Sequence, residues 1–493
     1  MKRIILLMAA VMVAGAMQGQ NVIIKKGNEG NRTDPQMVAN GRYLATVDGL
    51  DCWLTQSEEG ARGFVEDEDW QVVRLNDDMF PLERRELLMT EHCVPLAWAV
   101  KGKWASMLLV DSSQRKQTTV LKASVSLDSL QLKDGRVDTV TKFAYAKKDR
   151  CHVWGAMSAN GEYMGTLSVV QYTERKQYIS IATVYDAELK EVWSREFAVG
   201  TVECIYITDD GRMLTLGTER EGEEEHFIIC VIDRLGGDKF NMTVQCEPVK
   251  DMRIVNVLGP QMLCAGLIKP ADAKKDEDLT SGVATLSFNL DSMSIGGFTM
   301  RYFQNEDINI LTNEKTKKIQ RDRELPDVAP LSYVPTSYGM VMAVGRMVEE
   351  KDVNANGTKT CDYNGVGIHL VAVDATGAVK WVRNVRRNDR QTDSKALLRT
   401  PLFMMGETLC LVKNENRKEP GEYIISNDAR EYEVGDKSNL VLYRFSEEGD
   451  VRKDVLERKT KQALGAAALR YDGTTLLITV KGSKTRKMEM TLQ

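Results

Sequence analysis

The segment from Asp352 to Gly357 has the spacing of a calcium-binding loop. Side chains that carry oxygen alternate with apolar ones, and the glycine would allow the sharp bend that such loops require. The position that should supply a bidentate glutamate holds Tyr363 instead, and Asp362 stands one residue away. An ordinary Asn-Gly turn explains the same pattern. We therefore predict no metal site, although calcium binding at Asp352–Asn356 stays open.

Motifs for other kinds of catalysis are missing from the sequence. The four histidines are scattered along the chain, at positions 92, 152, 226 and 369. His226 follows a run of glutamates, which a solvated charged turn before the strand Phe227–Ile232 explains. Gly365-Val-Gly367 begins like a dinucleotide-binding fingerprint, but Leu370 occupies the third glycine position. With no G-x-S-x-G, H-E-x-x-H or phosphate-loop pattern either, we predict no catalytic residue and no cofactor, and the binding residues stay unknown.

The nine cysteines favour packing over chemistry. No two of them form a C-x-x-C pair and the closest two are 16 residues apart, so zinc and dithiol motifs are excluded. Cys230, Cys264 and Cys410 lie inside apolar runs, where a small buried thiol is expected. An oxidising compartment would permit disulfides, but nine is an odd number and the pairing cannot be deduced from spacing.

The first residues have the pattern of a secretory signal peptide. Met1-Lys2-Arg3 is a short basic start, Ile4–Ala16 is an uncharged apolar run, and Ala14-Gly-Ala16 offers small residues to a signal peptidase. A membrane anchor needs ~20 apolar residues to cross a hydrocarbon core of ~30 Å, so this run is too short. We predict that residues 1–20 are removed and that the mature chain is periplasmic or extracellular, without a transmembrane segment.

The composition is that of an ordinary folded protein, with 43% hydrophobic and 28% charged residues. The formal net charge is −5, and the sequence contains no sustained run of Lys and Arg. Proteins that bind nucleic acid do so chiefly through clustered cations that displace counterions. Nucleic acid is therefore not expected as a partner.

The elements that must position any site repeat along the chain. Turn-like residues with a glycine are followed by an apolar strand eight times, and glycine suits such corners because hairpin turns require positive φ. The eight sites are Asn40-Gly41, Lys101-Gly102, Asn160-Gly161, Asp210-Gly211, Leu258-Gly259, Tyr338-Gly339, Met405-Gly406 and Asp472-Gly473.

A second kind of turn follows in each of the middle six units. It is led by Asp or Ser and precedes a strand that often carries an aromatic residue; the leading residues are Asp128, Asp186, Asp233, Asp291, Asp374 and Ser446. Each unit therefore has the order strand, glycine turn, strand, loop, strand, Asp turn, strand. This order is typical of a four-stranded antiparallel meander. Coincidence in a β-rich chain, or an ordinary β-sandwich, is the alternative.

Two of these turns resemble repeats of known β-propellers. The segment Asp374–Trp381 resembles the repeat of pyrroloquinoline-quinone-type propellers, and Ser158–Tyr163 resembles the S-x-[DN]-G-x-[YF] turn of WD- and Tol-B-like repeats. The resemblance implies a propeller fold but no activity, and the quinone-binding side chains cannot be placed in this sequence.

We therefore predict an all-β protein in which residues 21–493 form a single β-propeller of four-stranded antiparallel blades. Seven blades are predicted, with eight as the alternative, because the first unit is interrupted by Glu66–Trp70 and by a short helix expected at Pro81–His92. A strand at Val22–Lys25 is expected to complete the last blade and so to remove exposed edges.

Long inserted segments are expected on one face of this propeller. They join strands two and three of a unit, or one unit to the next, and comprise residues 269–282, 304–327, 349–365, 384–400 and 414–438. Long loops on a rigid scaffold commonly bind ligands, although solvated loops of mixed charge explain the same segments.

These observations lead to one functional hypothesis with two alternatives. We expect an exported envelope protein of a Gram-negative bacterium, monomeric and non-enzymatic, that binds a protein or glycan through its long-loop face. The first alternative is a propeller hydrolase or lyase with an acidic site in the central channel. The second is a structural component of an envelope assembly.

Overall fold

The structure, a computed structural model, is built almost entirely of β-strands. It describes residues 22–492 except for 31–41, 57–69, 78, 80, 88–92, 174–176, 272, 274–277, 314–323, 354–358, 393–396, 399, 417–431, 470–472 and 482–483. The strands form seven four-stranded sheets and one five-stranded sheet, together with a small two-stranded sheet. Strands that are neighbours in the large sheets are antiparallel and follow the order of the chain, with two exceptions described below. Such meanders are the blades of a β-propeller.

The first four blades are continuous in sequence. Blade 1 consists of β2 (Arg42–Val47), β3 (Leu50–Gln56), β4 (Trp70–Leu75) and β5 (Pro81–Glu86), and blade 2 of β6 (Cys93–Lys101), β7 (Trp104–Asp111), β8 (Gln117–Ser126) and β9 (Asp138–Ala144). Blade 3 consists of β10 (Arg150–Met157), β11 (Tyr163–Tyr172), β12 (Gln177–Asp186) and β13 (Glu191–Glu196), and blade 4 of β14 (Cys204–Ile207), β15 (Met213–Glu221), β16 (Glu224–Ile232) and β17 (Gly237–Gln245). A short 3-10 turn, η1 (Lys133–Gly135), precedes β9.

The last four blades carry the insertions. Blade 5 consists of β18 (Val249–Leu258), β19 (Gln261–Ile268), β21 (Gly282–Asn289) and β22 (Ser294–Tyr302), and blade 6 of β24 (Val328–Thr336), β25 (Gly339–Val353), β26 (Lys359–Asp374), β27 (Val379–Thr392) and β30 (Tyr432–Glu433). Blade 7 consists of β28 (Leu402–Met405), β29 (Thr408–Asn416), β31 (Ser438–Phe445) and β32 (Val451–Thr460), and blade 8 of β33 (Ala463–Leu469), β34 (Thr475–Lys481), β35 (Lys484–Leu492) and β1 (Val22–Gly30). The helix α3 (Asn305–Thr312) and the strand β23 (Leu325–Pro326) lie between blades 5 and 6 in sequence, whereas β20 (Leu279–Thr280), which pairs with β23, lies between β19 and β21 of blade 5.

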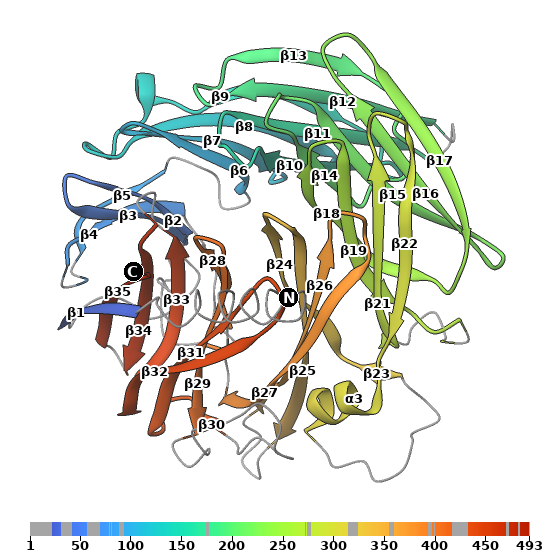
Figure 1. The fold of residues 1–493 in the computed structure, drawn as a ribbon. Helices are drawn as coiled ribbons and strands as arrows, with labels where there is room; N and C mark the ends of the chain where they lie inside the picture. The colour runs from blue at the N-terminus through green and yellow to red at the C-terminus, as the bar shows by residue number, and fades with distance from the viewer. Residues whose placement is uncertain are drawn as a thin grey trace, which may run out of the picture.

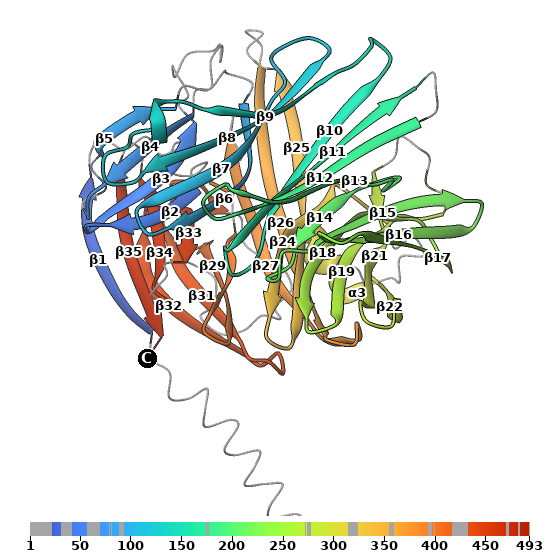
Figure 2. The same ribbon diagram turned by 90° about the horizontal axis from the view of Figure 1, so that it is seen from above.

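The blades follow one another around a closed ring (Figure 1). Eight clusters of buried apolar side chains fill the eight seams between neighbouring blades, including the seam where Trp53 of blade 1 packs near Ile478 of blade 8. The N-terminal strand β1 pairs with β35 from Val22↔Leu492 to Gly30↔Thr485, and it lies beside β35 in both ribbon views (Figures 1 and 2). This confirms the expected closure by the N-terminal strand.

Glycine turns join the first two strands of the blades, as the repeat predicted. Six of the expected glycines occupy these turns with positive φ, namely Gly102, Gly161, Gly211, Gly259, Gly406 and Gly473, whereas Gly339, with a φ of 159°, is the first residue of β25. The first turn differs, because β2 and β3 are joined by Asp48-Gly49, with φ of 51° and 79°, whereas Gly41 lies outside the described residues. The side of the ring that carries these turns is called the turn face below, and the opposite side the long-loop face.

The prediction of seven blades is not confirmed, because the described residues form eight large sheets and so fit the alternative. The helix expected at Pro81–His92 is wrong over Pro81–Glu86, which is the strand β5 and pairs with β4 at the outer edge of blade 1, while residues 88–92 lie outside the described residues. Five of its six residues are exposed, so it carries the polar side chains of an edge strand. Proline is tolerated there because its missing N–H faces away from the sheet.

The inserted segments are more ordered than plain loops. Segment 349–365 lies largely in β25 and β26, whose pairing continues from Glu349↔Tyr363 to Val353↔Lys359. Segment 304–327 contains α3, and its strand β23 pairs with β20 from segment 269–282. From segment 414–438, β30 pairs in parallel with β27, which itself extends to Thr392. The insertions therefore support one another through backbone hydrogen bonds.

The three cysteines predicted to be small buried thiols are buried. Cys230, Cys264 and Cys410 have no exposed surface, and all nine cysteines of the chain are free thiols. Burial raises the pKa of the Cys410 thiol to about 12, which keeps it protonated at neutral pH. In the described part of the chain, no helix has the length and apolar character needed to cross a membrane.

Candidate functional site

A hollow of about 740 Å³ opens on the turn face, where the first strands of blades 1, 2 and 3 end. Its lining comes from three consecutive units of the repeat: Tyr43, Leu44, Ala45 and Thr46 on β2; Trp98, Ala99, Val100, Lys101 and Gly102 at the end of β6; Met157 at the end of β10 and Ala159, Asn160, Gly161 and Glu162 after it; and Ala187 after β12. A volume of this size is typical of ligand pockets.

Irregular strand pairing occurs close to both aromatic side chains that line the hollow. The register of β2 against β3 shifts between Tyr43 and Ala45, and the register of β6 against β7 shifts between Pro95 and Ala97. Each bulge adds an unpaired residue, so the side chains that follow it change sides. Both bulges lie within a few residues of the lining of the hollow.

A half-buried arginine lies against Trp98, the largest aromatic residue of the lining. The guanidinium carbon of Arg42 is 4.7 Å from the ring centre of Trp98, and the side chain of Arg42 is half-buried. Burial lowers the pKa of Arg42, and none of the described acidic residues forms an ion pair with it. Arginine remains a cation at neutral pH, so a partly desolvated positive charge stands beside the hollow.

The rim of the hollow carries a small charge network. The ammonium nitrogen of Lys101 is 2.8 Å from a carboxylate oxygen of Glu188 and 3.8 Å from one of Glu162. The hydrogen bond that Lys101 donates to Glu188 raises the pKa of Lys101. Among the described residues that line the hollow, Glu162 is the single carboxylate. Hydrolysis of a glycoside in the usual way needs two facing carboxyl groups, and the lining does not supply them.

Beneath the hollow, a chain of hydrogen bonds leads to the seam between blades 1 and 8. The hydroxyl groups of Tyr43 and Thr46 are 2.8 Å apart, and the hydroxyl of Thr46 donates to Asp51 at 2.6 Å. The buried ammonium group of Lys487 donates to Asp51 at 2.9 Å and to Asp77 at 2.7 Å. Because Lys487 lies on β35, the floor of the hollow is fixed by the blade that closes the ring.

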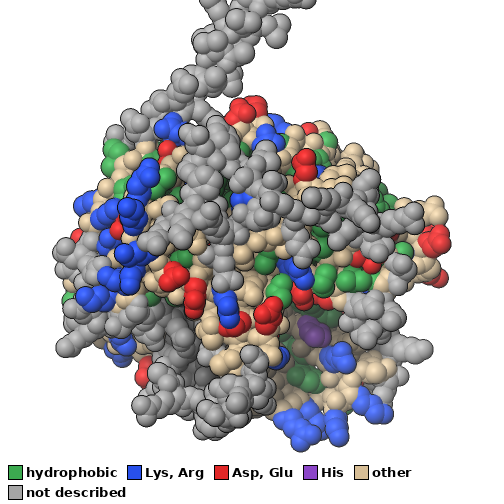
Figure 3. Space-filling model, turned by 90° about the horizontal axis from the view of Figure 1, so that it is seen from below, with side chains coloured by type: hydrophobic (Ala, Val, Ile, Leu, Met, Phe, Trp, Pro, Cys, Tyr) green, Lys and Arg blue, Asp and Glu red, His purple; other side chains and the backbone are tan. Residues whose placement is uncertain are grey.

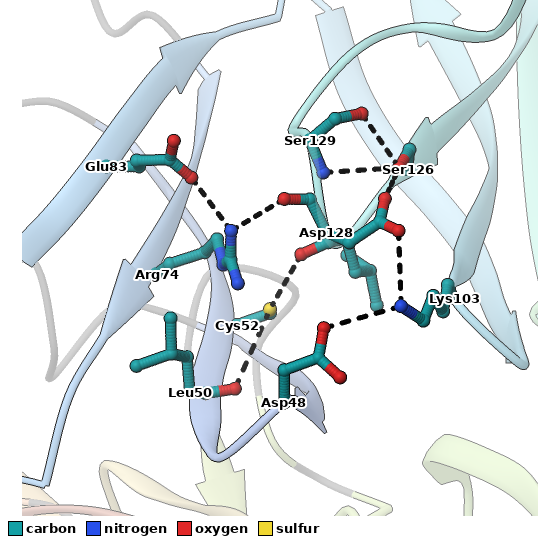
Figure 4. A network of polar contacts seen from close by, with 10 residues as sticks. Asp48, Leu50, Cys52, Arg74, Glu83, Lys103, Ser126, Asp128 and Ser129 are labelled. Atoms are coloured by element: carbon teal, nitrogen blue, oxygen red, sulfur yellow. Dashed lines mark hydrogen bonds and ion pairs between the residues drawn. The ribbon is translucent and has the colours of Figure 1, made fainter.

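A second network fixes the turns between blades 1 and 2 (Figure 4). Lys103, directly after the turn that lines the hollow, lies 3.3 Å from the carboxylates of both Asp48 and Asp128. Arg74 donates to the backbone carbonyl of Asp128 at 2.6 Å and to the carboxylate of Glu83 at 2.9 Å. These contacts join turns from two of the three blades that build the hollow.

The residues that the sequence singled out are not gathered at this hollow. His226 lies on β16, where its Nδ1 is 2.9 Å from the Thr243 hydroxyl, and the neighbouring Glu225 pairs with Arg220 at 3.2 Å. Asp352 lies near the end of β25, and the rest of the calcium-like loop, 354–358, falls outside the described residues. Within the part of the chain that the structure describes, no group of three His, Cys, Asp or Glu side chains is placed to hold a metal ion.

An acid–histidine pair occurs elsewhere, beneath helix α3. The buried His369 lies 3.3 Å from Asp307, which also accepts hydrogen bonds from Asn384 at 2.8 Å and from Arg301 at 2.9 Å. Although burial opposes its charged form, hydrogen bonds from His369 and Asn384 hold the pKa of Asp307 well below its usual value. The aspartate is fully engaged and buried, so this cluster anchors α3 to blade 6 and offers no surface to a substrate.

Comparison with known proteins shows similarity in shape alone. No protein-family model matches the sequence, and no curated protein matches it either. Solved structures that match include the WD40 domain of SCAP from fission yeast, at 8% identity, a TM-score of 0.36, and coverage of 95% of this chain and 98% of that one. The β-propeller domain of the Trilobed protease from Pyrococcus furiosus matches at 9% identity, with a TM-score of 0.32 and coverage of 81% and 93%. A polysaccharide lyase matches at 9% identity, with a TM-score of 0.36 and coverage of 96% and 98%. Similarities this low carry no information on function.

Proposed function

We propose that this protein is an exported, non-enzymatic β-propeller that binds a protein or glycan in the hollow of the turn face. The observation that carries the proposal is the hollow itself, built by three blades and lined by the aromatic side chains of Tyr43 and Trp98. Aromatic rings supply large contact areas at low entropic cost. The proposed export rests on the signal-like pattern of residues 1–20.

The position of the hollow changes which face is proposed to bind. The long-loop face was expected from the insertions, but the inserted segments pair with one another through β20 and β23 and through β27 and β30. The hollow lies on the opposite face and is bordered by short turns. Rigid borders favour a preformed binding site, because little conformational entropy is lost when the ligand arrives.

The charges around the hollow indicate the kind of ligand. Arg42 supplies a partly buried cation that no described carboxylate neutralises, whereas Lys101 is already engaged by Glu162 and Glu188. A desolvated cation binds an acidic group more strongly than a solvated one does. We therefore expect the ligand to carry an acidic group next to an apolar or ring-shaped part that contacts Trp98.

Replacing Trp98 with alanine tests this proposal. Ligands are first selected from a glycan array and a peptide library with the mature wild-type protein, and affinities are then measured by calorimetry. We expect Trp98→Ala to weaken binding at least about tenfold, since truncating an aromatic anchor costs ~2 kcal/mol or more. Trp104→Ala is the matched control, because Trp104 is an exposed tryptophan of the same blade outside the hollow.

Two results would contradict the proposal. The first is unchanged affinity in a Trp98→Ala protein that keeps the wild-type circular dichroism spectrum and melting temperature. The second is loss of binding on deletion of residues 417–431 with Trp98 intact, which would return the site to the long-loop face.

A further inference from the structure

Exposed basic side chains gather where blade 7 leads into blade 8. This basic patch consists of Lys26, Arg458, Lys459, Lys461, Lys481 and Lys484, all of which are exposed. Residues 458–461 form the connection from β32 to β33, and Lys481 and Lys484 face each other across the hairpin of β34 and β35. Connections of both kinds belong to the long-loop face, so the basic patch lies on the side of the ring opposite the hollow.

Strand pairing and ion pairs bring the three segments together. Ala463 pairs with Val480, which places Lys461 beside Lys481. Glu457 lies 3.4 Å from the ammonium group of Lys26 and also pairs with Arg486, so β32 is tied to both β1 and β35. Seen from below, Lys and Arg side chains gather on the side of the molecule where blade 8 lies (Figure 3).

Two of the described carboxylates lie close to the basic patch. Glu457 pairs with Lys26 of the patch and with Arg486, and Glu489 lies 3.6 Å from both Lys25 and Lys487. The chain as a whole has a formal charge of −5, so its overall composition does not account for this concentration of cations.

We propose that the basic patch docks the protein on an anionic membrane surface through the phosphates of lipid headgroups. Clusters of four to eight Lys and Arg side chains are the usual means of such docking, and each contributes on the order of 1 kcal/mol near the surface. Five of the six cations are lysines, whose compact charges suit a diffuse anionic surface, whereas bidentate recognition of one defined phosphate favours arginine. Docking through this side turns the hollow away from the lipid, so the hollow stays open to a ligand.

Vesicle sedimentation tests the docking. The mature protein is mixed with vesicles of phosphatidylcholine, or of phosphatidylcholine with about one third phosphatidylglycerol. We expect binding to the anionic vesicles alone, and its loss at 0.5 M salt, where the Debye length has fallen to about half its physiological value. The variant Lys459→Gln, Lys461→Gln, Lys481→Gln, Lys484→Gln should bind at least about tenfold more weakly, since it removes four charges.

A second quadruple variant controls for net charge. Lys133→Gln, Lys142→Gln, Lys147→Gln, Lys190→Gln removes the same charge from exposed lysines of blades 2 and 3, and it should bind like the wild type. Equal loss in both variants, or equal binding to neutral and anionic vesicles, would overturn the proposal. So would binding to duplex DNA or to an acidic polysaccharide without binding to vesicles. Ligand affinity at the hollow should be the same in both quadruple variants, so this test is independent of the proposed function.

Discussion

Lys487 is expected to hold blade 8 against blade 1, and replacing it with methionine measures how much this contact contributes to the free energy of unfolding. Its side chain is 5% exposed and bridges blade 8 to Asp51 and Asp77 of blade 1. The two acids differ, because the Asp51 side chain is 1% exposed whereas that of Asp77 is 74% exposed. The solvated pair contributes little, so the effect of the substitution should come from Asp51.

The expected loss follows from leaving a charge buried. In Lys487→Met the Asp51 carboxylate keeps the hydrogen bond from Thr46 but loses its ammonium partner. Breaking a buried ion pair by removing one partner typically lowers the free energy of unfolding by about 3–5 kcal/mol. Urea denaturation followed by circular dichroism measures this difference.

Two further variants make the measurement decisive. Lys484→Met, an exposed position on the same strand, should change stability by no more than about 0.5 kcal/mol. Asp51→Asn combined with Lys487→Met should recover part of the loss, since it removes the buried charge that the single substitution leaves behind. If Lys487→Met costs no more than Lys484→Met, then Lys487 does not hold the seam and the reasoning is refuted.

The remaining predictions concern pH and close packing. Although burial opposes the charged form of Lys487, hydrogen bonds to Asp51 raise its pKa above 10.5. The stability that Lys487 contributes should therefore be fully present at neutral pH and be lost only as the pH rises through this raised pKa. Alkaline denaturation of the wild type and of Lys487→Met tests this. Burial raises the pKa of Glu203, so the charged form of this side chain lowers stability at neutral pH. The variant Glu203→Gln should therefore have a higher melting temperature at pH 7. A gain in melting temperature that persists below pH 4 would speak against this cause. In Gly217→Ala the new Cβ would lie 1.9 Å from the carbonyl oxygen of Thr201, so we expect the free energy of unfolding to fall by about 3 kcal/mol or more. In the control Gly222→Ala, where φ is 62° and the space around the glycine is open, it should fall by about 1 kcal/mol. Equal losses in the two variants would contradict the packing argument.

The repeat in the sequence was sufficient to predict the blades because each turn needs only local chemistry. A glycine such as Gly211 supplies positive φ, and an Asp such as Asp186 accepts hydrogen bonds from the backbone N–H groups of Glu188 and Lys190. The blade count was harder, since the charged segment Pro81–Glu86 carries no alternation of apolar and polar residues. An exposed edge strand has no buried face to impose that pattern.

The hollow could not be predicted for a different reason. Tyr43, Trp98 and Glu162 belong to three units separated by more than fifty residues, and the strand pairing is irregular close to Tyr43 and Trp98. Bulges leave no clear mark in a sequence pattern. The basic patch was missed likewise, because its cations come from three separate segments and no single run of the sequence is strongly basic.

The pairing of β1 with β35 also constrains the order in which the chain can fold. The first strand of the ring is made early in synthesis, but its partner, Lys484–Leu492, is made last. Until then β1 has no pairing partner in its own sheet, and the seam between blades 8 and 1 cannot form. Contacts that join such distant parts of a chain are slow to form, and an unpaired strand is prone to aggregate in the meantime. A chain closed in this way therefore completes its fold only after synthesis has reached β35, and any factor that shields Val22–Gly30 until then would protect it from misassembly.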